Sequence, residues 1–277
     1  TAQLVIAGRE AAQPVAAEPG VESNVRISLR AEEVTRIGNF PITNSLVLST
    51  LVMLGLATVA IALNRKLKMI PGAIQNLFEI FLEQILDLMD TVFGDRARSE
   101  KYLPLAGTIF LFVLFSNWLG LLPGVGSIIV RLPHETAPLL RSPSADLNFT
   151  LALAIITVIS VNVLGAFAIG AGSHASKFFN FKNPVAFFIG ILELVSEGAR
   201  MVSFSFRLFG NVFAGEVLLT IIGFLLPYAA PIPFLFLEVF VGFIQALIFT
   251  MLAVVFISIA ITPHEHEEGN GHQKVTI

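Results

Sequence analysis

The most informative stretch of the sequence is Glu193-Leu-Val-Ser-Glu-Gly-Ala-Arg-Met-Val-Ser-Phe-Ser-Phe-Arg-Leu-Phe-Gly-Asn-Val-Phe-Ala-Gly-Glu216, because it places charged side chains in a segment apolar enough for a bilayer. Its polar members include two arginines, three glutamates and one asparagine. A charge at the centre of a membrane helix costs about 2.5–3.5 kcal/mol on insertion scales, so charges at that depth are rare. A functional site is therefore the first hypothesis for this segment.

The polar side chains of this stretch gather on one face of a helix. At about 100° per residue, five of them fall within a sector of roughly 80°. They are Glu193, Glu197, Arg200, Arg207 and Asn211. Glu216 lies off this stripe, roughly 140° from Glu193 by the same arithmetic. One interpretation is that the charges form ion pairs that hold one helix against another, as charges inside membranes do.

Arg207 favours a different interpretation. Its near neighbours Phe206 and Leu208 are apolar, and the nearest carboxylate on its own face is more than two helical turns away. An intramembrane arginine without a local carboxylate is held either for a mobile partner or for a second chain.

The composition indicates a membrane protein. Of the 277 residues, 55% are hydrophobic and 13% are charged, and the mean hydropathy is +0.81; these values exclude an ordinary soluble domain. The net charge of −3 gives no basic field for nucleic acid. Cysteine is absent, which excludes disulfides, thiol nucleophiles and thiolate metal sites. No glycine-rich phosphate loop is present, so nucleotide chemistry is not expected on this chain.

We predict an all-α polytopic membrane protein with about five membrane-embedded helices and one amphipathic interfacial helix. A polar outer-side arm (1–40) precedes a membrane domain (41–262), and a polar inner-side tail (263–277) follows it. The predicted membrane segments are 45–63, 103–122, 146–170, 184–226 and 234–261, and the interfacial helix is 72–93.

The orientation follows from a basic cluster. The first membrane segment begins at Pro41, with Thr43, Asn44 and Ser45 as capping candidates. It ends at the cluster 65–68, Arg-Lys-Leu-Lys, which indicates the cytoplasmic or matrix side by the positive-inside bias. The amino terminus is therefore expected outside and the carboxyl terminus inside.

The segment 72–93 has the pattern of a helix that lies along the membrane surface. Apolar residues recur at helical spacing, and acidic residues line the opposite face. This acidic stripe consists of Glu79, Glu83, Asp87 and Asp90, and Asn76 lies on the same face. Because this face does not attract anionic lipid, a protein partner and plain solvent are equally supported for it.

The segment 184–226 is too long for an upright span. Its 43 residues would extend about 64 Å as a helix, twice the roughly 30 Å of the hydrocarbon core. Either 203–211 contains a break or one helix runs steeply tilted, and the tilted helix is favoured. The following segment, 234–261, carries Glu238 and Gln245 on one face. A hairpin closed by 227–233 brings this face against the arginine stripe.

Two further polar groups have weaker interpretations. Asp146 is suited to the first turn of its helix. For Asn148, Thr150 and Asn162, hydrogen bonds between helices are favoured over a role in an ion pathway. His264, His266 and His272 in the tail are candidate metal ligands, but a solvated tail is favoured.

Several of these stretches together resemble subunit a of F-type ATP synthases. The most specific are Ser205-Phe-Arg-Leu-Phe-Gly-Asn-Val-Phe-Ala-Gly-Glu216 and Gln245-Ala-Leu-Ile-Phe-Thr-Met-Leu252. Ser142-Pro-Ser-Ala-Asp-Leu-Asn-Phe-Thr150 and Asn117-Trp-Leu-Gly120 resemble other parts of the same family, in consistent order over about 40–262.

The resemblance implies the stator subunit of a membrane motor, with two offset proton half-channels against a rotating c ring. Arg207 would face the ring carboxylate and block a proton short-circuit, with Asn211 one turn along and Gln245 opposite. Glu216 and Glu238 would line the outer half-channel, where members often have a histidine in place of one glutamate. Asp146 and Asn148 would also belong to the pathway.

The inner half-channel, by the same resemblance, lies near Glu193, Glu197 and Arg200. The expected partners are the c ring, the peripheral-stalk b subunits, other ATP synthase subunits and the lipid bilayer. No cofactor and no metal is implied. The expected location is a bacterial inner membrane, with the mitochondrial inner membrane as the alternative.

The chemistry of the residues agrees with these roles. Arginine keeps its proton at any accessible pH, so it can hold an ionised carboxylate without carrying protons itself. Two other classes stay open: a secondary transporter, which should show an internal repeat, and an assembly subunit that uses its charges to bind neighbours. Sodium in place of the proton is a variant of the main hypothesis.

Overall fold

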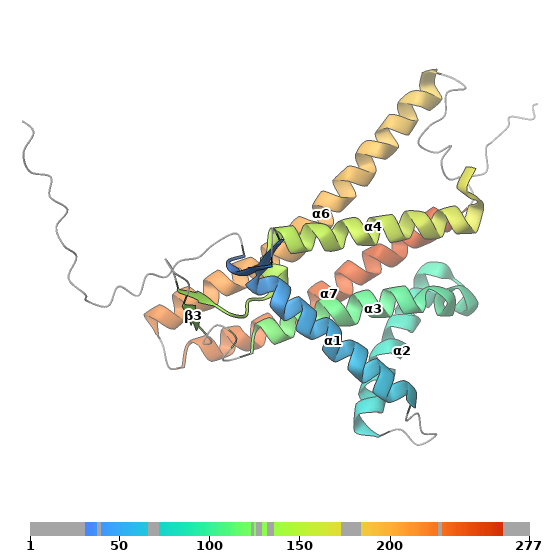
Figure 1. Cartoon of the computed structure of the whole chain (residues 1–277). Coiled ribbons are helices and arrows are strands. Elements are labelled where there is room, and N and C mark those ends of the chain that lie inside the picture. Colours follow the sequence, from blue (N-terminus) through green and yellow to red (C-terminus); the bar gives the residue numbers. More distant parts are fainter. Residues whose placement is uncertain are drawn as a thin grey trace, which may run out of the picture.

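The computed structural model describes residues 31–37, 40–65, 72–122, 125, 129–131, 136–172, 184–226 and 229–262. Six long helices dominate this part of the chain (Figure 1). They are α1 (Asn44–Arg65), α2 (Ala73–Phe93), α3 (Arg96–Gly120), α4 (Leu147–Ile169), α6 (Pro184–Leu225) and α7 (Pro231–Ile261). Two short antiparallel hairpins, β1 (Glu33–Ile37) with β2 (Phe40–Thr43) and β3 (Ile129–Arg131) with β4 (Thr136–Pro138), and the 3₁₀ turn η1 (Pro143–Ala145) complete it.

The predicted fold class is confirmed. Among the described residues, five helices are long and apolar enough to cross a membrane, and α2 is not one of them. The tail with its three histidines and residues 1–30 lie outside the described part.

The starts of α3 and α7 differ from the sequence prediction, whereas α1 begins one residue from the predicted start at 45. Pro41 belongs to β2, and α1 begins only at Asn44, where the Thr43 hydroxyl accepts a hydrogen bond from the Leu46 N–H (3.3 Å). The helix α3 starts at Arg96 because the Asp95 side chain caps it by accepting from the Ala97 N–H. Hydropathy detects only the apolar part of such a helix, so it placed the start at 103. Proline at the first position likewise lets α7 begin at Pro231.

The core lies where α3, α4, α6 and α7 meet. The helix α7 packs against α3, α4 and α6, and α4 packs against α6. Small buried residues on α7, including Gly242, Ala246 and Ala253, allow these close approaches. Asn117 and Trp118 of α3 donate hydrogen bonds to the carbonyls of Gly242 (3.1 Å) and Val239 (3.0 Å), which fixes α3 along α7.

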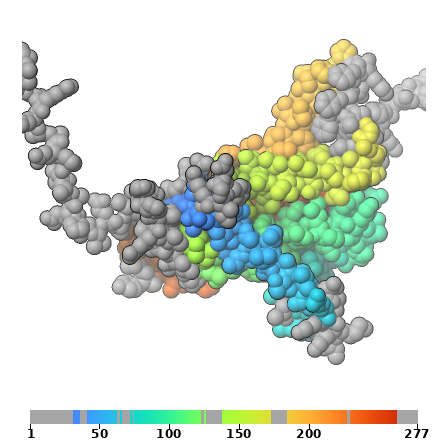
Figure 2. All heavy atoms as spheres, viewed as in Figure 1, coloured from blue at the N-terminus to red at the C-terminus, as the bar shows by residue number. Residues whose placement is uncertain are grey.

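The outer surfaces of the helices are apolar, as a bilayer requires. Leu54 of α1, Ile156 of α4 and Phe188 of α6 are each about 60% exposed (58%, 61% and 60%). Figure 2 shows α1, α3 and α4 as adjacent bands on one face of the molecule.

The helix α6 is continuous over 42 residues. The predicted single long helix is therefore right, and no break occurs at 203–211. Its first part projects away from the other helices, whereas its second part runs alongside the bundle and leads into α7 (Figure 1).

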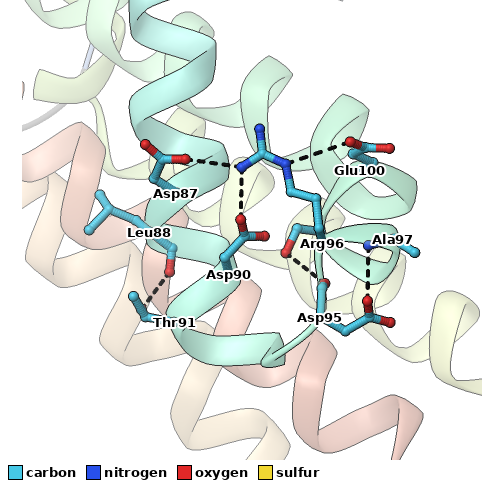
Figure 3. A network of polar contacts seen from close by, with 9 residues as sticks. Asp87, Leu88, Asp90, Thr91, Asp95, Arg96, Ala97 and Glu100 are labelled. Atoms are coloured by element: carbon cyan, nitrogen blue, oxygen red, sulfur yellow. Dashed lines mark hydrogen bonds and ion pairs between the residues drawn. The ribbon is translucent and has the colours of Figure 1, made fainter.

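Arg96 organises the turn between α2 and α3. Its guanidinium bonds Asp87 (3.0 Å) and Asp90 (2.7 Å) of α2, and it lies 3.6 Å from Glu100 (Figure 3). The pKa of Asp90 lies below the ordinary value for a carboxyl group, because the Ser99 hydroxyl and then Arg96 favour its ionised form. Part of the acidic stripe on α2 is thus neutralised within the chain.

Residues 141–146 are held tightly between the helices. Ser142 lies so close to Gly120 at the end of α3 that a Cβ atom there would approach the Ser142 Cβ to 2.5 Å. The Ser45 hydroxyl at the start of α1 donates to Asp146 (2.8 Å). The turn η1 also packs on α6, so this segment connects the first half of the chain to the hairpin.

Candidate functional site

Arg207 lies on the surface of α6 and faces away from the bundle. Its neighbours Phe204, Ser205 and Leu208 are buried against other helices, whereas Arg207 itself is exposed. Within the residues that the structure describes, its side chain forms no ion pair and no hydrogen bond. An arginine on the apolar surface of a membrane helix requires a partner, and the part of the chain that the structure describes does not supply one.

Asn211 and Gln245 join the two limbs of the hairpin one turn beyond Arg207. The Asn211 Nδ2 donates to the Gln245 Oε1 at 3.0 Å. Gln245 is 2% exposed, and among the described residues its Nε2 is buried without an acceptor. Beneath them, the buried hydroxyls of Thr150 and Ser205 (3.1 Å) join α4 to α6. The predicted meeting of the Gln245 face with the polar stripe is confirmed.

Glu238 and Glu216 lie together further along the hairpin. Glu238, on α7, is 9% exposed, and its carboxylate occupies the space beside Gly215, the residue before Glu216. Glu216 is 40% exposed and forms an ion pair with Arg141, with 3.2 Å between Nη2 and Oε2. Glu238 forms no ion pair with any described residue. The two carboxyl groups therefore differ in their partners.

Arg200 holds a second cluster of acids on the other side of Arg207. It bonds Glu197 (2.8 Å) and Glu193 (3.3 Å) on its own helix. Asn162 of α4 donates to Glu197 (3.3 Å), and the Arg200 guanidinium lies 4.8 Å from the centre of the Phe256 ring of α7. Arg200 is therefore ion-paired within its own helix, in contrast to Arg207, and these two ion pairs do not join α6 to another helix.

The spacing along α6 separates the two acidic groups. Glu197 precedes Arg207 by about 15 Å and Glu216 follows it by about 14 Å, at the helical rise per residue. The exposed arginine therefore stands between two sets of carboxylates that do not touch each other.

Asp146 acts as a helix cap in the structure. Its Oδ1 accepts from the Asn148 N–H (3.0 Å) at the start of α4, and its Oδ2 accepts from the Ser45 hydroxyl (2.8 Å). It is 4% exposed, whereas the Asn148 side chain is exposed. Asp146 is therefore the N-cap of α4, one residue before the first turn in which the sequence prediction placed it.

Sequence reasoning missed two residues of the site. The sequence analysis assigned no role to Arg141, and nothing in its spacing points to Glu216, which lies 75 residues away. Gly215 appeared only as part of a motif. Its small size is the signal that could have identified it, because a glycine in a membrane helix indicates that a second helix approaches closely there.

Comparisons with known proteins agree with this geometry. The family model described as "ATP synthase A chain" matches residues 45–258. "ATP synthase subunit a" of Moorella thermoacetica is 32% identical over 230 residues, which cover 83% of this chain and 96% of that protein. "ATP synthase subunit a" of Campylobacter jejuni subsp. jejuni serotype O:23/36 is 36% identical over 211 residues, 75% of this chain and 85% of that protein. The chain therefore belongs to the ATP synthase subunit a family and is a multi-pass membrane protein of the stator of the proton-transporting Fo sector, with other ATP synthase subunits as its partners.

Proposed function

We propose that this chain forms two offset proton half-channels against a rotating c ring and couples proton flow to rotation. In this arrangement Arg207 faces the ring carboxylate, with Asn211 and Gln245 beside it. The observation that carries the proposal is the exposed Arg207, which has no partner among the described residues. Every other ionisable side chain of α6 forms an ion pair.

A fixed cation between two acidic clusters explains why protons do not pass directly from one half-channel to the other. A ring carboxylate must be ionised to pass Arg207, because the arginine cannot lose its own proton. It therefore releases a proton into one half-channel before it passes and takes up another beyond. Each elementary charge moved across 100 mV is worth about 2.3 kcal/mol, which is the source of the torque.

Glu216 and Glu238 are proposed to form the outer half-channel. The Glu238 carboxylate lies beside Gly215, the residue before Glu216, which supports this role, since a proton relay needs titratable groups along one route. Asp146 and Asn148, at the start of α4, would border this channel. Both Asp146 oxygens accept hydrogen bonds, so we assign it to the wall of the channel and not to the relay.

Glu193 and Glu197 are proposed to form the inner half-channel with Arg200. Glu193 is the more exposed of the two, at 40% against 12%, so it would meet water first and Glu197 would lie deeper. Asn162 and Arg200 hold the Glu197 carboxylate in place.

The proposal also covers the surroundings of the chain. The membrane domain 41–262 would sit in a bacterial inner membrane with the arm 1–40 outside and the tail 263–277 inside, and the peripheral-stalk b subunits would bind it. The basic cluster at 65–68 supports this orientation. The acidic face of α2 is a surface for a protein partner.

The test is Arg207→Ala in the whole complex, reconstituted in vesicles, with Arg98→Ala as a matched control. Arg98 is an exposed cation (62%) at the start of α3 and lies near the Asp95 carboxylate. Arg207→Ala should abolish ATP synthesis and ATP-driven proton pumping and allow passive proton leak, whereas Arg98→Ala should do neither. Normal ATP-driven pumping in Arg207→Ala would refute the proposal. A sodium-dependent and pH-independent signal in the parent complex would instead identify sodium as the coupling ion.

A further inference from the structure

A buried cation reaches the proposed outer half-channel from a part of the chain distant in sequence. Arg141 is 7% exposed and is a partner of Glu216 on α6. Its Nη2 lies 3.2 Å and its Nε 3.4 Å from the same oxygen, Oε2. Both nitrogens of one edge of the guanidinium thus converge on one carboxylate oxygen.

The arginine is the fixed member of the pair. It belongs to the 141–146 segment, in which Ser144 and Ala145 are fully buried and Ser142 lies directly against Gly120. The Glu216 side chain is 40% exposed and has room to move. A carboxylate that moves while its counter-ion stays in place can make and break the pair.

The other charged groups near Glu216 cannot serve as its positive counter-ion in place of Arg141. On α7, the neighbouring acid is Glu238, which is negative or neutral and cannot compensate a carboxylate. At η1 and α4, Asp146 is occupied by Ser45 and the Asn148 N–H. On α6 itself, Arg207 is nine residues away, about 14 Å along the helix. Among the described residues, Arg141 is the only cation in an ion pair with Glu216.

We propose that Arg141 is a positioning residue for proton transfer, the fixed counter-ion that keeps Glu216 ionised until a proton arrives from the outer side. This inference rests on the proposed function, because it assumes that Glu216 is part of the proton route. A proton that binds Glu216 must compete with the Arg141 guanidinium for the carboxylate. The pair therefore sets the outer pH at which Glu216 loads a proton, since a nearby opposite charge favours the ionised form of an acid.

The experiment measures ATP synthesis by the reconstituted complex at a fixed membrane potential while the pH on the outer face is varied. In Arg141→Gln, the outer pH that gives half the maximal rate should rise by about one unit or more, because the competing cation is gone. Arg141→Lys, which keeps the charge, should restore a profile close to that of the parent. Arg96→Gln, which removes an exposed cation at the α2–α3 turn, is the matched control and should leave the profile unchanged.

The result that overturns the inference is an Arg141→Gln complex whose pH profile coincides with the parent's. If Arg141→Gln lowers the amount of assembled complex, Glu216→Gln is added. Recovery of assembly supports the charge pair, and no recovery counts against it, because residue 141 then acts independently of Glu216.

Glu216→Gln alone separates this inference from the proposed function. If Glu216→Gln leaves ATP synthesis and pumping intact, Glu216 is not on the proton route and the proposed outer half-channel is wrong. If Glu216→Gln abolishes transport while Arg141→Gln leaves the pH profile unchanged, only the role of Arg141 is wrong.

Discussion

The carboxylate of Glu238 on α7 fills the space beside Gly215 of α6 that any larger residue would need for its Cβ atom. The two limbs of the hairpin approach closely here because one of them has no side chain. A buried acid is thereby admitted next to Glu216 without separating the helices.

Gly215→Ala should therefore impair the complex. Inserting a methyl group into a filled site typically costs about 1–3 kcal/mol, and here it also displaces the acid. We expect about a tenfold or larger loss of ATP-driven proton pumping per assembled complex. Gly223→Ala is the control, since a Cβ atom at Gly223 meets nothing within 4 Å. Adding Glu238→Asp, which shortens the acid by one methylene group, should restore part of the loss, and full pumping in Gly215→Ala would contradict this account.

Asn211 and Gln245 should show energetic coupling. Their hydrogen bond crosses the hairpin at 3.0 Å, and Gln245 is almost completely buried. Asn211→Ala leaves the Gln245 amide without this partner, at a cost of about 1–3 kcal/mol for an unsatisfied buried group. Replacing both residues with alanine should then cost clearly less than the sum of the single replacements. The thermal stability of the detergent-solubilised complex measures this, and additive effects would show that the contact is not formed in the assembly.

The sequence was sufficient for the architecture because the relevant signals are local. Apolar length identifies the membrane helices, and the opposing acidic stripe identifies α2 as amphipathic. The absence of a break between Pro184 and Leu225 correctly favoured one long helix. The errors occurred where capping and not hydropathy decides the boundary, as at Asp95, whose side chain starts α3 well before its apolar part.

The site could be predicted only in part, because side-chain partners depend on tertiary packing. The stripe on α6 follows from helical periodicity, and Arg200 with Glu197 is a local pair. Arg141 and Glu216 are brought together only by the packing of η1 on α6, which no spacing rule contains. The sequence also could not distinguish a relay acid from a capping acid at Asp146, since both are buried carboxylates in a membrane.

The pairing of Arg96 with Asp90 should depend on pH in one direction. The pKa of Asp90 is lowered in the folded state, so its contribution to stability is present above the ordinary carboxyl pKa and is lost as the pH falls through the lowered value. Arg96→Ala should therefore increase hydrogen exchange at the α2–α3 turn at neutral pH. This difference from the parent should begin to shrink below about pH 4 and should disappear only as the pH falls through the lowered pKa of Asp90. The comparison is made at matched pH, and the effect should be small because the groups are exposed. A difference that grows with acidity would contradict the pairing.

Substitutions of Asp146 distinguish a helix-capping role from a proton-carrying role. As a cap, its Oδ1 accepts from the Asn148 N–H, a role that asparagine fills equally well. Asp146→Asn should therefore retain most ATP-driven pumping, whereas Asp146→Ala should lose about 1 kcal/mol or more of stability and reduce the assembled complex. Ser45→Ala is the matched control, because it removes only the hydrogen bond to Oδ2. If Asp146→Asn abolishes pumping while the complex assembles normally, the carboxyl group itself carries protons, and Asp146 belongs to the relay with Glu216 and Glu238.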